Sequence, residues 1–138
     1  YGPRQAAHHL LSTFVRSAVH DRPLIISGDG MQIRDWIHVD DHCAGLLVAF
    51  QRGRAGEAYN LSGNCERTDL GMARSVLSVL GKPESLLSND PTRPDFDRRR
   101  AADATKAARH FSWYPRRPFK MHFAPVIREL AGNFADCP

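Results

Sequence analysis

The residues best suited to bind an anion lie together in residues 28–43, which read GDGMQIRDWIHVDDHC. The glycines indicate a turn, because glycine reaches backbone angles that other residues resist. The alternating pattern over residues 33–39 then predicts a strand with Arg34, Trp36 and His38 on one face. A guanidinium forks onto phosphate oxygens, and aromatic rings offer a flat neighbour. This face therefore suits a planar, anionic ligand.

Hydrophobic periodicity predicts the elements that must hold this strand. Helices are expected over residues 7–20, 41–51, 68–80, 103–111 and 120–134, and strands over residues 24–27, 33–39, 58–63 and, weakly, 85–88. The residues expected to cap helices are Asp40 or Asp41, Thr68 or Asp69, and Asp103. The apolar stripe of the second helix, which is expected to face the core, consists of Cys43, Leu46, Leu47 and Phe50. The alternation indicates an α/β or α+β class. The strands are too few and short for a free-standing doubly wound sheet, so the chain is expected to pack on another part.

Length and composition limit the function classes. A chain of 138 residues is at most one ordinary domain, and its hydrophobic (42%) and charged (25%) fractions are those of a soluble globular protein. No apolar run approaches the roughly 20 residues of a membrane span. The three cysteines form neither a disulfide framework nor a zinc motif, which favours the reducing cytoplasm. The chain begins at Tyr1, within a motif and without Met, which indicates a fragment.

The sequence lacks two motifs that short-chain dehydrogenases use, the glycine-rich dinucleotide fingerprint and a catalytic Tyr followed four places later by Lys. No glycine-rich phosphate fingerprint follows a strand near the start. No Tyr is followed four places later by Lys, since those places hold Gln5, Gly63 and Pro118. No catalytic residue is therefore predicted in this chain.

The order of several motifs resembles that of the dTDP-glucose 4,6-dehydratases, which are NAD-dependent epimerase/dehydratase-type members of the extended short-chain dehydrogenase/reductase family. The motifs that carry the resemblance are Tyr1-Gly2-Pro3, Gly28-Asp29-Gly30, Arg34-Asp35-Trp36, Asp41-His42, Tyr59-Asn60, Arg93-Pro94 and Asp103-Ala104-Thr105-Lys106. The resemblance runs from Tyr1 to about Ile127. It implies an α/β fold: the C-terminal portion of a Rossmann-type enzyme, mainly its small substrate-binding lobe. Residues 1–138 would then be a partial chain that lacks the N-terminal Rossmann half.

The resemblance also implies an activity for the intact enzyme. That activity is loss of water from a nucleotide-diphosphate hexose to give a 4-keto-6-deoxy sugar, with NAD accepting and returning a hydride. NAD would be bound mainly by the missing half, so the chain alone is expected to hold the nucleotide-diphosphate sugar and to be inactive. A cytoplasmic homodimer without membrane contact is implied for the intact protein.

The resemblance assigns binding roles to individual residues. Arg34 and Arg93 would contact the substrate pyrophosphate, and Asn60 would help hold the nucleotide. Further substrate-binding positions, several of which depart from the family pattern, are His9, Leu10, Ile25, Ser27 and Phe96. Tyr1 is the expected cofactor contact. The departures include Arg100, which stands where the family has Tyr, and they leave the base open between dTDP, UDP and another nucleotide.

Other interpretations of these residues stay open. A nucleotide-sugar epimerase or decarboxylase would share most of the motifs. A non-catalytic basic module would present residues 97–100 to nucleic acid, although that run is short and lacks interleaved aromatic residues. An unstable remnant is a third reading. His38, Asp40, Asp41 and His42 resemble metal ligands in type but not in spacing, so no metal site is expected.

Overall fold

The computed structural model describes residues 1–92 and 97–135. Its helices are α1 (Leu10–Val19), α2 (Val39–Arg52), α3 (Asp69–Leu80), α4 (Thr105–Phe111) and α5 (Phe119–Ala135), with a short 3-10 turn at Glu84–Leu86. Its strands are β1 (Leu24–Ser27), β2 (Ile33–Asp35), β3 (Glu66–Thr68), β4 (Leu87–Asp90) and β5 (Arg99–Arg100). All the predicted helices are confirmed, with ends that differ by a few residues.

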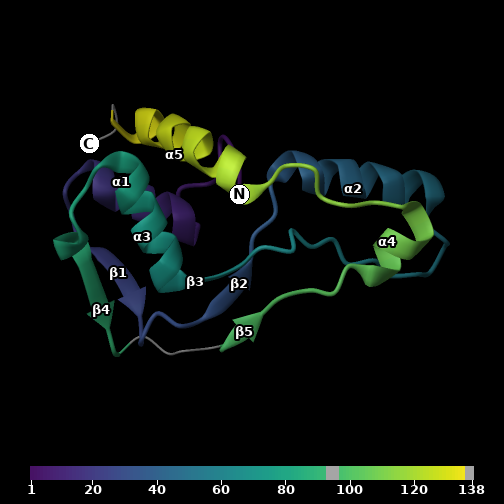
Figure 1. Cartoon of the computed structure of the whole chain (residues 1–138), viewed down its shortest axis with the longest axis horizontal. Helices are drawn as coiled ribbons and strands as arrows, with labels where there is room; N and C mark the ends of the chain where they lie inside the picture. Colours follow the sequence, from purple (N-terminus) through teal and green to yellow (C-terminus); the bar gives the residue numbers. More distant parts are fainter. Residues whose placement is uncertain (93–96, 136–138) are drawn as a thin grey trace.

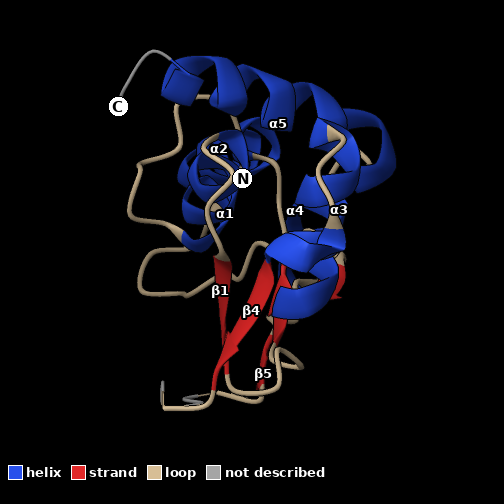
Figure 2. Ribbon diagram, turned by 90° about the vertical axis from the view of Figure 1, so that its left-hand side faces the viewer, coloured by secondary structure: helices blue, strands red, loops and turns tan. Residues whose placement is uncertain are grey.

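In the larger lobe α1 and α3 pack against the parallel pair β1 and β4, and α5 packs on α1 and α3 (Figures 1 and 2). Helix α1 is central, since it contacts both α3 and α5. Its buried face is formed by Leu11, Phe14, Val15 and Ala18, each at most 1% exposed. This is the face that the helical spacing predicts, and burying each larger side chain contributes about 1.5–3 kcal/mol.

The smaller lobe consists of α2, α4 and the loops that join them, around Ala107, Phe111 and Trp113. A three-stranded sheet with the order β3-β2-β5 lies between the two lobes in Figure 1. Strand β2 runs antiparallel to β3 and parallel to β5. The stretch that the sequence singles out is therefore the middle strand of a sheet whose neighbours come from distant segments.

The strand predictions are only partly confirmed. The strand expected over residues 33–39 is cut to Ile33–Asp35, because α2 already begins at Val39. The strand expected over residues 58–63 is wrong: within the described residues this segment joins no sheet. Side chains hold it instead, since Lys106 Nζ donates to the Ala58 carbonyl at 2.8 Å.

Three further strands escaped the sequence pattern in whole or in part. β3 and β5 are short and charged, so neither shows the apolar alternation that marks a strand. The strand expected over residues 85–88 begins later, as β4, because a 3-10 turn precedes it.

The helix caps differ from the prediction at two of three helices. Thr68 caps α3 as expected, because its Oγ1 accepts from Gly71 N at 3.0 Å. Helix α2 is capped by His38, whose Nδ1 accepts from Asp40 N at 3.2 Å, so neither predicted aspartate is its cap. At α4 the cap position is Ala104, and Asp103 Oδ1 accepts from Thr105 N at 2.8 Å from one residue earlier.

The apolar stripe of α2 is not a core face. Leu46, Leu47 and Phe50 are 52%, 57% and 89% exposed, and Cys43 is exposed too. The side of α2 that is buried carries Asp41 and Gly45 instead. The prediction that the stripe faces the core is wrong, because no described element covers that side. No helix in the described part of the chain is long and apolar enough to cross a membrane.

Candidate functional site

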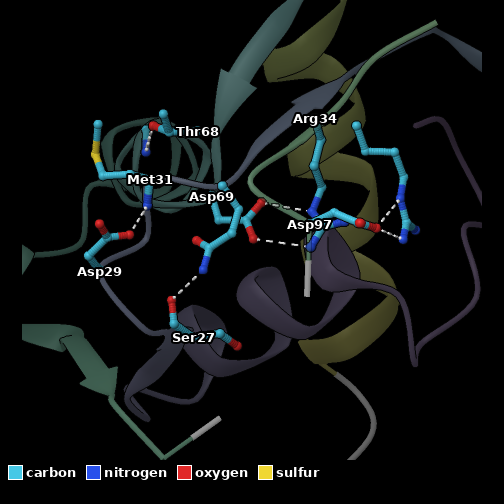
Figure 3. Close-up of polar contacts among 10 residues, drawn as sticks. Ser27, Asp29, Met31, Arg34, Thr68, Asp69 and Asp97 are labelled. Atoms are coloured by element: carbon cyan, nitrogen blue, oxygen red, sulfur yellow. Dashed lines mark hydrogen bonds and ion pairs between the residues drawn. The ribbon is translucent and has the colours of Figure 1, made fainter. Parts of the chain in front are cut away.

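Arg34 is the predicted site residue whose geometry best suits an anion. It lies on β2, and its Nε and Nη2 contact the two carboxylate oxygens of Asp69 at 2.9 and 3.3 Å (Figure 3). The Asp69 side chain is 6% exposed, whereas that of Arg34 is 39% exposed. A guanidinium carries five N–H donors, so the fork to Asp69 orients the group and leaves other donors for a ligand.

Local contacts hold β2 in place at both ends. At its start, Asp29 in the Gly28–Gly30 turn pairs with Arg98 through Nη1 at 2.9 Å, and Gln32 Nε2 donates to the Ser27 carbonyl at 3.1 Å. At its end, Asp35 accepts from Gly63 N and Cys65 N at 2.9 and 2.8 Å. These bonds fix the strand between two loops and thereby fix the direction of the Arg34 side chain.

Two arginines that sequence reasoning did not assign to the site lie beside Arg34. The strand register pairs Arg34 with Arg67 on β3 and with Arg100 on β5. The sequence contains no apolar alternation around either residue, so nothing local marked them as neighbours of Arg34. The only signal was that Arg100 departs from the resembled family.

The predicted site residues Ile25 and Ser27 lie on β1, in the two-stranded sheet that β1 forms with β4. Leu24 and Ile26 are buried in the core, so Ile25 points away from it and is 39% exposed. Ser27 is half-buried at the end of β1, and its carbonyl accepts from Gly30 N at 3.1 Å as well as from Gln32.

Tyr1 and His9 lie together at a different place. Both line a cavity of about 350 Å³ that also involves Pro3 and Val39. His9 is exposed at the N-cap of α1, where its carbonyl accepts from Thr13 N at 2.9 Å. The next residue, Leu10, begins α1 and packs against the core of the larger lobe.

Asn60 is anchored in the smaller lobe. Its Nδ2 donates to the Asp103 carbonyl at 3.3 Å and so ties the loop after α2 to the start of α4. The Asn60 contact therefore joins two loops of the smaller lobe, whereas the Arg34–Asp69 pair joins β2 to α3 in the larger lobe. The other two predicted contacts, Arg93 and Phe96, lie outside the described residues.

The expected cofactor contact lies among several aromatic side chains. The one expected cofactor contact, Tyr1, packs its ring edge-on against His38, Phe119 and Phe123. Its hydroxyl is buried with no partner in the described part of the chain. Burial, reinforced by the charges of Cys65 and Asp41, raises the pKa of this hydroxyl to about 12.

Asp41 and His38, at the start of α2, make contacts that hold the local structure. Asp41 is 3% exposed and accepts from the backbone of Arg116 and Arg117, at 3.0 and 2.8 Å. His38 caps the helix. Among the described residues, no group of three or more His, Cys, Asp or Glu side chains gathers as metal ligands would.

His38 makes the stability of this region depend on pH. Burial lowers the pKa of the imidazole below its ordinary value, with Arg117 and His122 adding to the effect and Asp40 opposing it. The unfolded chain therefore takes up the proton first as the pH falls. The free energy of unfolding is full above the unfolded pKa of about 6.5 and declines as the pH falls towards the lower folded pKa.

The variant His38→Asn keeps a capping acceptor and removes this titration. We expect the decline of unfolding free energy between about pH 7 and pH 5 to be shallower in the variant than in the wild type. Urea unfolding at a series of pH values measures the difference. Equal slopes for both proteins would show that His38 does not titrate in this way.

Comparison with known proteins gives these positions a family context. Residues 1–62 match the model of the NAD dependent epimerase/dehydratase family. The chain is 40% identical over 133 residues to the dTDP-glucose 4,6-dehydratase of an Actinoplanes species, covering 96% of this chain and 42% of the relative. It is 34% identical over 135 residues to the dTDP-glucose 4,6-dehydratase of Streptomyces antibioticus. The chain thus spans about two fifths of the length of these curated relatives.

Solved structures give the same result for the fold. The dTDP-glucose 4,6-dehydratase DesIV of Streptomyces venezuelae, solved with NAD bound, superposes with a TM-score of 0.92 at 32% identity, covering 96% of this chain and 41% of that one. The Bacillus anthracis dTDP-glucose 4,6-dehydratase, in complex with NAD, superposes at 0.89 with 33% identity over 96% of this chain and 42% of that one. The predicted fold class is confirmed. Over nearly its whole length the chain is thus similar to the C-terminal part of Rossmann-type dTDP-glucose 4,6-dehydratases, and its first 62 residues match the NAD dependent epimerase/dehydratase family.

Proposed function

We propose that this chain supplies the substrate-binding part of a nucleotide-diphosphate-sugar 4,6-dehydratase, a lyase that removes water from a nucleotide-diphosphate hexose. The observation that carries the proposal is the position of Arg34 on the central strand β2. Its half-exposed guanidinium is oriented by the buried Asp69 at the start of α3. The names of the relatives support the reaction class. The dinucleotide-binding part of the intact protein would lie outside residues 1–138.

In this proposal Arg34 binds the pyrophosphate of the substrate, and Asp69 acts through Arg34 as a positioning residue. A forked guanidinium matches phosphate oxygens in both geometry and charge. Ile25, Ser27, Arg93 and Phe96 remain proposed substrate contacts, as do His9, Leu10 and Asn60. Tyr1 remains a proposed contact to NAD, and homodimer formation remains a proposal for the intact protein.

The ion pairs of residues 97–100 argue against a bare nucleic-acid patch there. Arg98 pairs with Asp29, Arg99 with Glu66 and Arg100 with Asp97. A non-specific nucleic-acid site needs cations that are available to successive phosphates. Arg98 and Arg99 are each held by both oxygens of a carboxylate, so this short run does not present successive cations to a nucleic-acid backbone.

The test is a product assay on the intact protein with dTDP-glucose and UDP-glucose. A 4,6-dehydratase yields a 4-keto-6-deoxy hexose, detected as the loss of one water in the mass of the nucleotide sugar. An epimer, separated by chromatography from the substrate of equal mass, or loss of carbon dioxide when UDP-glucuronic acid is supplied as a further substrate, would assign the protein to the rival reactions of the family. Failure to bind any nucleotide-diphosphate sugar would overturn the proposal altogether.

The Arg34→Gln variant tests the residue that carries the proposal. We expect about 10- to 100-fold weaker binding of dTDP-glucose, because a charged hydrogen bond contributes about 1.5–3 kcal/mol. The matched control is Arg74→Gln, since Arg74 is an exposed arginine paired with Glu84 on the α3 side. Calorimetry should give the control the wild-type affinity. Equal losses in both variants would contradict a specific role for Arg34.

A further inference from the structure

The sheet between the lobes lines up three arginines. Arg34 on β2 is the register partner of Arg67 on β3 and of Arg100 on β5. Register partners on neighbouring strands point to the same face of a sheet, about 4.8 Å apart. Like charges directly opposite each other destabilise a sheet. A row of three guanidiniums is therefore a costly arrangement unless anions neutralise it.

The opposite face of the same sheet is closed by an ion pair. Arg99 precedes Arg100 on β5, so its side chain points the other way. Its Nε and Nη2 contact the two oxygens of Glu66 at 2.8 and 2.5 Å. Adjacent arginines on one strand therefore have different surroundings, and only Arg100 shares a face with Arg34.

The three arginines of the row are held differently. Arg67 lies over the ring of Phe119, 4.7 Å from its centre, and so faces α5. Arg34 is clamped by the buried Asp69. Arg100 pairs with Asp97 three residues earlier, and both Arg100 contacts fall on the same Asp97 oxygen.

The Arg100 pair is the one that a ligand can displace. Arg100 and Asp97 are 69% and 51% exposed, whereas Asp69 is 6% exposed. Exposed ion pairs contribute little because solvent screens them. In the view of Figure 3, Asp97 is drawn on the side of Arg34 away from Asp69.

We propose that Arg100 is a further diphosphate-binding residue, on the strand next to Arg34, and that Asp97 is its resting partner, which the diphosphate displaces. This inference rests on the proposed function, because it concerns the same substrate. Two guanidiniums one strand apart reach the two phosphates of one diphosphate. A diphosphate carries more charge than one exposed carboxylate and can fork to both arginines. Arg100 then selects nucleoside diphosphates over monophosphates.

The test measures binding of UDP, dTDP and dTMP to the intact protein by calorimetry. We expect Arg100→Gln to weaken binding of the diphosphates about 10-fold and of dTMP less, because a forked, charge-assisted contact is lost. Arg99→Gln is the matched control: the same residue type on the same strand, facing away. It should stay within about twofold of the wild type, as expected for the loss of an exposed pair.

Two more variants examine the competition with Asp97. Asp97→Asn removes the competing charge, so the diphosphate no longer has to break an exposed ion pair. Because such a pair contributes little, diphosphate binding should tighten by only about threefold. Arg100→Lys keeps the charge without the fork and should bind with an affinity between those of Arg100→Gln and the wild type. Thermal melting of each variant separates lost binding from lost folding.

The outcomes distinguish this inference from the proposed function. If the wild type binds diphosphates and Arg34→Gln does not, but Arg100→Gln binds as Arg99→Gln does, the role of Arg100 is overturned and the function stands. Unchanged or weaker binding by Asp97→Asn overturns the competition. If the wild type binds neither the nucleoside diphosphates nor their sugars, both proposals fall.

Discussion

Replacing Asp41 by alanine lowers the free energy of unfolding by about 3–5 kcal/mol, the cost of breaking a buried charged contact on one side. The side chain is 4% exposed and bonds three donors of the loop that leads into α5. Without it, the backbone N–H groups of Arg116 and Arg117 lose their acceptor, and the Arg117 guanidinium loses a partner. The loop then no longer holds the start of α5, whose residues form part of the main core.

Asp40→Ala is the matched control for this prediction. Asp40 precedes Asp41 and contacts the same arginine, at 3.2 Å from Arg117 Nε, but it is 55% exposed. Its loss should cost at most about 1 kcal/mol, as for other exposed pairs. Urea unfolding of the two variants measures the difference. A similar loss of unfolding free energy in both variants would contradict the role of Asp41 in holding the loop before α5.

Replacing Gly63 by alanine destabilises the protein by about 3 kcal/mol or more, at the upper end of what overpacking costs. A Cβ at this position would lie 2.0 Å from the Trp36 carbonyl oxygen and 2.8 Å from the Ile37 Cα. Both are backbone atoms, so no side chain can turn aside. The loop must move away, and the bond from Gly63 N to Asp35 lengthens with it.

Gly132→Ala is the opposite case in the same protein. Gly132 lies within α5, and a Cβ there would meet nothing within 4 Å. Alanine has the higher helix propensity, so this variant should gain about 0.5–1 kcal/mol. Thermal unfolding of both variants gives the signs. A Gly63 variant as stable as the wild type would show that the loop has room that the structure does not contain.

The helices of the larger lobe were predictable because their pattern is local. The spacing of Leu11, Phe14, Val15 and Ala18 states which side of α1 is apolar, and burying that side stabilises the helix. The same reasoning failed for α2. Its apolar side is as clear in sequence, yet Leu46, Leu47 and Phe50 stay exposed because burial also requires a partner surface.

The strands were less predictable, for a related reason. β3 and β5 are held by their pairing with β2, and their own residues are charged. Residues 58–63 have the composition of a strand, but their polar groups find side-chain partners such as Asp35 and Lys106. Pairing depends on which segments meet, and local composition does not report that.

The sequence by itself determined the mixed helix–strand character, the main helices and the Gly28–Gly30 turn, and it singled out Arg34 as a candidate for binding an anion. These follow from side-chain chemistry and from spacings of a few residues. Only the tertiary structure decided that Arg34, Arg67 and Arg100 share one face, and that Asp41 fastens a distant loop. The physical reason is that strand register and buried charge pairing join residues 33 to 76 positions apart. Those contacts form only when the whole chain packs.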